Sequence, residues 1–110
     1  MTPDKVSYAD FSKLDIRVGK IVEARKVEGS KKLLELKIDI GGTVKRAVAG
    51  IASYYDVDKL PGAQVAVVTN LQPRTIFGLE SEVMILAAFA NEKLAILRPD
   101  AEVETGAKVS

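Results

Sequence analysis

Two consecutive glycines, Gly41 and Gly42, divide the most regular stretch of this sequence and constrain its fold more than any other feature. In residues 34–40 apolar side chains alternate with charged ones, which is the pattern of a strand with one face in water. The glycine pair tolerates the positive φ that a two-residue turn between antiparallel strands requires. Residues 44–51 then return as a further strand. The sequence therefore predicts a β-hairpin and a fold built on antiparallel pairing.

The segment before this hairpin predicts a short helix followed by a long strand. Ser7 is a candidate N-cap with Asp10 three residues later, so a helix is expected over residues 7–14. From Ile16 the period changes to two, which predicts the first strand. Gly19 lies inside this strand, where a glycine often marks a bulge or a sharp bend.

The second half of the chain supplies the remaining predicted strands. Residues 64–71 form the expected fourth strand, and residues 83–89 form an apolar fifth strand that the barrel or a partner subunit buries on both faces. The other expected elements are a helical turn at 52–58, a loop or irregular hairpin at 72–82, a short strand at 94–97 and one more strand ending near 105–106. We expect a single all-β domain over residues 1–110. Its architecture would be a five-stranded Greek-key barrel of the OB type, with a short N-terminal helix, a helical turn between strands three and four, and extra C-terminal strands.

The composition removes most kinds of catalytic and metal site. The chain has no cysteine and no histidine, so it lacks thiolates, disulfides, the commonest general base and the commonest metal ligand. Glu80 and Glu82 flank Ser81, but no base accompanies the serine, and solvated loop charges explain the two carboxylates best. We expect no enzymatic activity, no cofactor and no metal site. No apolar run approaches the roughly 20 residues of a membrane span, and we expect a cytoplasmic protein with no membrane partner.

The charge is distributed unevenly along the chain. Residues 1–50 hold 11 Lys and Arg against 7 Asp and Glu, whereas residues 51–110 hold 5 against 8. This asymmetry predicts either a basic face built from the N-terminal half or strands that carry lysines simply as solvated residues. The cations expected on a basic face are Lys20, Lys31, Lys32, Lys37 and Arg46. No aromatic residue falls among these strands, which favours folded RNA bound through its backbone shape over single strands bound by base stacking.

Several short blocks of the sequence together resemble one known family. They are Asp15–Val22, Lys32-Leu33, Leu36–Asp39, Ala49–Ile51, Asn70–Arg74, Gly78–Ser81 and Met84–Ala88, in that order. From Phe11 to about Val109 the chain is similar to the tRNA-binding OB domain that is appended to, or associated with, methionyl-tRNA synthetase. The resemblance implies an OB barrel, a homodimer built through C-terminal strands, tRNA bound by its shape, and no catalysis. It also implies that the domain raises the synthetase's hold on tRNA.

The resemblance further implies which residues lie at or near the RNA. These are Lys32, Arg46, Asn70, Arg74, Ser81 and Met84. The lysine and the arginines would meet phosphates, while Asn70 and Ser81 would donate to phosphate or ribose oxygens. A methionine in an apolar strand is more often core packing, so Met84 has that second interpretation. The chain departs from the family where Thr75, Ile76 and Phe77 replace a basic pair, which removes positive charge from that loop.

A second resemblance leaves the function open between two classes. Ser81-Glu82-Val83 and Arg98-Pro99-Asp100 are similar to the CsaA-type export chaperones, which share the barrel and the dimer but hold unfolded or preprotein segments. In that interpretation Ile76 and Phe77 would line a peptide-binding surface. Lys32-Leu33 and Ala49–Ile51 fit the synthetase-associated domain better. A chain of this length beginning at Met1 favours a standalone subunit, although an excised domain would have the same sequence.

Overall fold

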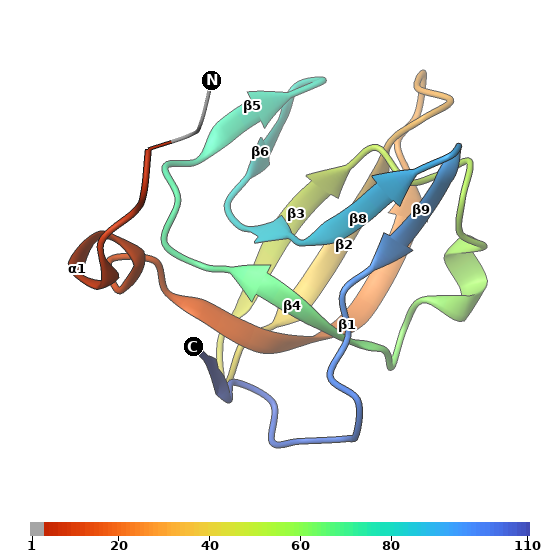
Figure 1. Cartoon of the computed structure of the whole chain (residues 1–110). Coiled ribbons are helices and arrows are strands. Elements are labelled where there is room, and N and C mark those ends of the chain that lie inside the picture. The colour runs from red at the N-terminus through yellow and green to blue at the C-terminus, as the bar shows by residue number, and fades with distance from the viewer. Residues whose placement is uncertain (1–3) are drawn as a thin grey trace.

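Antiparallel strands account for almost all of the regular structure in the computed structural model, which describes residues 4–110 (Figure 1). The elements in chain order are α1 (Tyr8–Phe11), β1 (Ile16–Lys26), β2 (Leu34–Asp39), β3 (Val44–Ala49), the 3-10 turn η1 (Val57–Lys59), β4 (Gln64–Val68), β5 (Arg74–Ile76), β6 (Leu79–Ser81), β7 (Met84–Ile85), β8 (Ala87–Ala90), β9 (Lys93–Ile96) and β10 (Lys108–Val109). Ser7 caps α1 as predicted, because its hydroxyl oxygen accepts from the N–H of Asp10 at 3.0 Å. No helix within the described residues is long and apolar enough to cross a membrane.

Five of the strands curl into a nearly closed barrel. They follow the order β3-β2-β1-β4-β7 with antiparallel neighbours, and β10 pairs with the first residues of β1. The seam between β7 and β3 is closed by the N–H groups of Glu82 and Val83, which donate to the carbonyl oxygen of Arg46 at 2.8 and 3.3 Å. The N–H of Val48 also donates to Ser81 Oγ at 3.0 Å. The predicted all-β barrel, with a short N-terminal helix and a helical turn between strands three and four, is confirmed.

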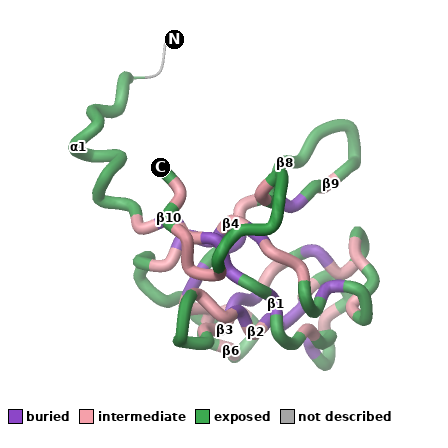
Figure 2. The backbone as a smooth tube through the Cα atoms, turned by 90° about the horizontal axis from the view of Figure 1, so that it is seen from below, coloured by how far each residue is buried: buried purple, intermediate pink, exposed green. Residues whose placement is uncertain are grey.

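The barrel is filled by the inward-facing side chains of its strands. The largest fully buried side chains are Ile21, Leu34, Leu36, Ile38, Leu60, Val65 and Val67. In β2 the alternation predicted from the sequence holds for the core, because its three even-numbered residues are all buried in one cluster. Figure 2 shows the buried positions gathered inside the barrel and the exposed positions outside it. One charged residue, Glu35, is buried on the opposite face of β2 and belongs to the site described below.

Two predictions about glycines have different outcomes. The glycine pair between β2 and β3 has φ of 105° and 100°, so the predicted turn is confirmed. The predicted bulge at Gly19 is wrong, because the register of β1 against β2 shifts between Ile21 and Glu23 instead. Gly19 is buried, and a Cβ there would lie 2.6 Å from Ile38 Cγ2. This glycine therefore permits a close approach within the core, and the alternative of a bend at Gly19 stays a prediction.

The C-terminal half departs from its predicted strands. Residues 83–89 do not form one doubly buried strand: Val83 and Ile85 are buried, but every residue of β8 is exposed (Figure 2). Within the described residues β8 pairs with β9 alone, as a separate hairpin, and its burial by a partner subunit stays a prediction. The segment 72–82 contains the regular hairpin β5–β6. The last strand, β10, follows residues 105–106 rather than ending at them.

Candidate nucleic-acid interface

The outer surface of β1, β2 and β3 is bordered by two connections that touch each other. One is the loop of residues 27–33 between β1 and β2, and the other is the β5–β6 hairpin (Figure 1). The hairpin tip reaches the loop, since a Cβ built on Gly29 would lie 3.4 Å from the ring of Phe77. We call the outer surface of β1–β3 together with this loop the basic face. Its cations are Lys20, Arg25, Lys37 and Arg46 on the strands and Lys31 and Lys32 in the loop. Lys26, the last residue of β1, lies opposite the buried Leu34 and borders the end of this face.

A buried carboxylate joins two arginines of the basic face. Glu35 is 4% exposed, and the strand register places it opposite Arg25. Arg25 Nε donates to Glu35 Oε1 at 2.8 Å, while Arg46 Nε lies 2.9 Å from Glu35 Oε2 with its N–H pointing elsewhere. The hydrogen bond from Arg25 is the main cause of a lowered pKa for the Glu35 carboxyl, which is therefore ionised at neutral pH. Within residues 4–110 neither arginine has a partner for its Nη atoms, so the Arg25–Glu35–Arg46 cluster keeps outer N–H groups for a ligand.

Three of the predicted RNA-contacting residues line one cavity. The cavity has a volume of about 230 Å³, is lined by Arg74, Ser81 and Met84, and lies beside the seam between β3 and β7. Met84 is 42% exposed, so it lies at the surface of this cavity instead of in the core. The Ser81 hydroxyl is used by the barrel, because it accepts from the N–H of Val48 and donates to the carbonyl oxygen of Val83 at 3.3 Å. Arg74 supplies positive charge, since no ion pair within the described part of the chain engages it.

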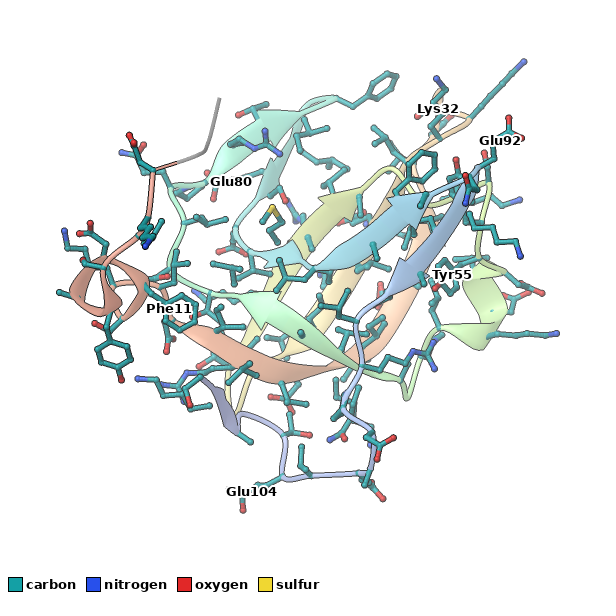
Figure 3. The ribbon with its side chains drawn as sticks, in the orientation of Figure 1. Phe11, Lys32, Tyr55, Glu80, Glu92 and Glu104 are labelled. Atoms are coloured by element: carbon teal, nitrogen blue, oxygen red, sulfur yellow. The ribbon has the colours of Figure 1, made fainter. Side chains whose placement is uncertain are left out.

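The other three predicted residues lie outside this cavity: Arg46 belongs to the cluster described above, and Lys32 and Asn70 lie elsewhere. Lys32 is exposed on the loop of residues 27–33, at the end of the barrel where the β5–β6 hairpin tip also lies (Figure 3). Asn70 follows β4 and ties the N-terminal segment to the barrel. Its Oδ1 accepts from the N–H of Asp15 at 2.8 Å, and its Nδ2 donates to the carbonyl oxygen of Lys13 at 2.7 Å. An RNA contact by Asn70 would have to replace these bonds, so its role in binding stays a prediction.

The similarity of this chain to known proteins extends over almost its whole length. A family model described as "Putative tRNA binding domain" matches residues 16–108. The chain belongs to this family. The methionine–tRNA ligase of Caldanaerobacter subterraneus is 44% identical over 107 residues, which are 97% of this chain and 17% of the ligase. That of Pyrococcus furiosus is 46% identical over 104 residues, 94% of this chain and 14% of the ligase, so the chain spans less than a fifth of these curated relatives.

Solved structures of two kinds share the fold of this tRNA-binding domain. The MetRS-related protein of Pyrococcus horikoshii has a TM-score of 0.91 and 30% identity, and the match covers 98% of this chain and 100% of that one. The CsaA chaperone of Bacillus anthracis has a TM-score of 0.88 and 29% identity, covering 97% of this chain and 100% of that one. Both resemblances seen in the sequence are confirmed. The two TM-scores are too similar for the fold alone to distinguish a synthetase-related domain from a chaperone.

The residues of this tRNA-binding domain that sequence reasoning missed are those whose partners lie elsewhere in the chain. The sequence motifs give no role to Arg25 and Glu35, and the signal for their pairing is their opposite charges on two neighbouring predicted strands. The sequence assigns Phe77 only to peptide binding, because nothing in it places the ring against the loop of residues 27–33. The fold brings all three to one region.

The interface supplies charge and shape for binding. The hydrogen bonds of Ser81 go to backbone groups, so no base activates its hydroxyl. Within residues 4–110 no three Asp or Glu side chains converge as metal ligands would. The arrangement is that of a binding module.

Proposed function

We propose that this domain binds folded tRNA on its basic face, without catalysis, and assists methionyl-tRNA synthetase. The observation that carries the proposal is the Arg25–Glu35–Arg46 cluster in a member of a tRNA-binding family. Its buried carboxylate holds two guanidinium groups whose outer N–H groups are available to phosphates. Cations fixed on separate elements recognise the spacing of phosphates in a folded RNA rather than its sequence.

The other residues of the proposed interface extend this surface on two sides. Lys32 and Arg74 contact phosphates from the loop and from the hairpin, while Met84 contacts a ribose in the cavity that it lines with Ser81. The role beside a synthetase is supported by the relatives named methionine–tRNA ligase, which carry a similar segment within a much longer chain.

Replacing Lys32 and Arg74 together by alanine should weaken tRNA binding and flatten its dependence on salt. Neither side chain forms an ion pair within residues 4–110, so the change leaves no stranded partner in that range. Each lost phosphate contact lowers the slope of log affinity against log salt by about 1, so the double variant should lose about 2. Equilibrium binding of folded tRNA across roughly 50–200 mM salt measures this slope.

A control is Lys108→Ala, which removes one positive charge, half of what the double variant loses, from β10 at the other end of the barrel (Figure 1). It should leave the slope unchanged. A double variant with the affinity and slope of the unaltered chain would contradict the roles of Lys32 and Arg74. Binding of tRNA that ignores salt altogether would contradict the basic face as its binding surface.

A second candidate function is the binding of unfolded polypeptide. It is favoured by the structural similarity to CsaA chaperones and by Phe77, Met84 and Leu71, which are apolar side chains exposed at or near the β5–β6 hairpin. The same titration separates the two functions when an unfolded polypeptide is added as competitor. Displacement by polypeptide, with little response to an RNA duplex or to salt, would favour the chaperone function.

We further infer that two copies of the chain associate through β8. All four of its residues are exposed, including Phe89 at 61%, whose ring contacts Tyr54 edge-on with 6.1 Å between the ring centroids. Leu97, just after the paired strand β9, is exposed as well. Exposed apolar surface of this kind is typical of a region that a second subunit covers.

The variant Phe89→Asp should dissociate this dimer and leave the barrel folded. Charging an apolar anchor weakens an interface by about 2 kcal/mol or more, which is roughly a 30-fold loss of dimer affinity. Sedimentation measures the loss, and circular dichroism checks the fold. The contrasting variant Ile85→Asp should unfold the chain, because Ile85 is buried in the barrel. An unaltered chain that remains monomeric, or a Phe89→Asp variant that remains dimeric, would rule this interface out.

A further inference from the structure

A second cavity, of about 370 Å³, lies between the loop of residues 27–33 and the tip of the β5–β6 hairpin. Arg25, Lys26, Glu28, Glu35 and Phe77 contribute to its lining. It is therefore bordered by cations, by carboxylates and by one aromatic ring. Its volume is near the lower end of the roughly 300–1,000 Å³ of small-molecule sites, which is room for one nucleotide but not for a duplex.

The aromatic ring belongs to Phe77, which lies in a turn where bulky side chains are uncommon. Phe77 and Gly78 form the two-residue turn of the hairpin, with φ of 54° and 81°. Asn, Asp and Gly are favoured at such positions, and a bulky residue with positive φ is strained. The Phe77 ring approaches Gly29 of the loop and is still 59% exposed. The ring is thus fixed at the cavity with much of its surface open, at some cost to the stability of the turn.

The charged groups around the ring fit a nucleotide better than either a bare phosphate or an apolar peptide. Arg25 is held by Glu35 through Nε, which leaves its Nη groups for a phosphate. Lys26 lines the same cavity and has no ion pair within residues 4–110. The exposed carboxylate of Glu28 would repel a phosphate but accepts from a ribose hydroxyl or from an exocyclic amino group of a base.

We propose that this cavity holds one unpaired nucleotide of the bound RNA, with its base stacked on Phe77 and its phosphate beside Arg25 and Lys26. Glu35 is a positioning residue that fixes Arg25. The proposal rests on the tRNA-binding function and adds a structural feature that the domain selects, an unstacked nucleotide next to a helical stem. Stacking on an aromatic ring tolerates every base, so this selection needs no particular sequence.

The test uses an RNA stem with a single unpaired 2-aminopurine, whose fluorescence falls when the base stacks. The chain has no tryptophan, so its own emission does not interfere. The unaltered chain should quench the probe. Phe77→Asn places a residue that tolerates positive φ in the turn, so this variant should stay folded and melt a few degrees higher. It should bind the RNA about 5- to 150-fold more weakly and leave the probe unquenched.

Two further variants separate stacking from other effects. Phe77→Tyr retains the ring and should retain both affinity and quenching. Tyr8→Ala removes an exposed ring from α1, outside the cavity, and should change neither. Quenching by Phe77→Asn equal to that of the unaltered chain would overturn the stacking site, whether or not affinity falls. An unaltered chain that binds tRNA but does not distinguish this RNA from a fully paired duplex would also overturn it, and would leave the tRNA-binding function standing. Absence of any tRNA binding would overturn that function and the cavity proposal together.

Discussion

Replacing Gly19 by alanine should lower the free energy of unfolding by roughly 3 kcal/mol or more. The added Cβ would lie 2.6 Å from Ile38 Cγ2 and 2.9 Å from Val67 Cγ2. Both neighbours are fully buried and branched at the β-carbon, so neither can swing its methyl group away without disturbing the core. For a domain of this size the loss corresponds to a melting temperature lower by about 12 °C or more.

Urea denaturation of Gly19→Ala and Gly50→Ala, side by side, measures this effect. Gly50 is the matched control, because a Cβ there would meet nothing within 4 Å and its φ is not positive. Gly50→Ala should change stability by less than about 1 kcal/mol, and in the stabilising direction. Adding Ile38→Leu to Gly19→Ala moves the obstructing methyl off the β-carbon at constant volume and should recover part of the loss. Equal stability of the two alanine variants would show that β1 does not approach β2 and β4 as closely as described.

The parts of the fold that the sequence predicted correctly are those encoded by neighbouring residues. The turn between β2 and β3 was predictable because two glycines can adopt positive φ where few other residues can. The cap of α1 was predictable because Ser7 and Asp10 supply the required groups three residues apart. The alternation of β2 followed directly from its period of two.

The errors arose where a distant segment decides the outcome. The sequence around Gly19 predicts a bulge or a bend, but it does not show the close approach of the buried Ile38 across the β1–β2 pair and of Val67 across the β1–β4 pair. Residues 83–89 form an uninterrupted apolar run, and composition alone cannot show that the barrel ends after Ile85 and leaves β8 exposed. An apolar strand that meets water in one chain has the same sequence signature as a core strand.

The candidate site was predicted in part for the same reason. The blocks shared with a known family drew attention to Arg74, Ser81 and Met84, which the structure places around one cavity. The pairing of Arg25 with Glu35 depends on a register that shifts within β1, and a slip of one residue would place either side chain on the other face. The contact of Phe77 with the loop of residues 27–33 requires the whole β5–β6 hairpin to fold back over β3. Neither arrangement leaves a local signal in the sequence.

The double variant Arg25→Met with Arg46→Met should lose about 2–3 kcal/mol of stability at pH 7. This loss is a little below the usual cost of leaving a buried charge without its partner, because the cluster lies at the surface of a small domain. Methionine keeps the aliphatic cover over Glu35 and removes both charges, so the carboxylate stays buried without a cation at either oxygen. Adding Glu35→Met should restore most of the stability, since an apolar cluster of similar volume replaces a buried ion group at little cost. Denaturation in urea measures all three chains.

The difference in stability between the unaltered chain and the double methionine variant should depend on pH in a definite direction. In the unaltered chain the pKa of Glu35 is lowered by its hydrogen bond to Arg25. Its contribution to stability is therefore present above the ordinary pKa of an unfolded glutamate, and it is lost as the pH falls through the lower, folded value. In the double methionine variant burial without a partner raises the pKa of Glu35, and protonation on acidification relieves the penalty. The stability gap between the two chains should therefore narrow from pH 7 towards pH 4. A gap that stays constant over this range would show that removing the arginines leaves the pKa of Glu35 unchanged, which would contradict their effect on this carboxyl.

The triple variant separates what the cluster does for folding from what it does for RNA. With Glu35, Arg25 and Arg46 all replaced by methionine, stability should return close to its original value. The tRNA affinity should remain low, because the N–H groups that we propose to bind phosphates are absent. A cluster that only stabilised the barrel would show the two properties falling and recovering together. A buried carboxylate is a poor means of stabilising a small β-barrel, since an apolar side chain would fill the same space without the desolvation cost. We propose instead that Glu35 holds Arg25 through a hydrogen bond and Arg46 through an ion pair, in positions from which both would meet phosphates.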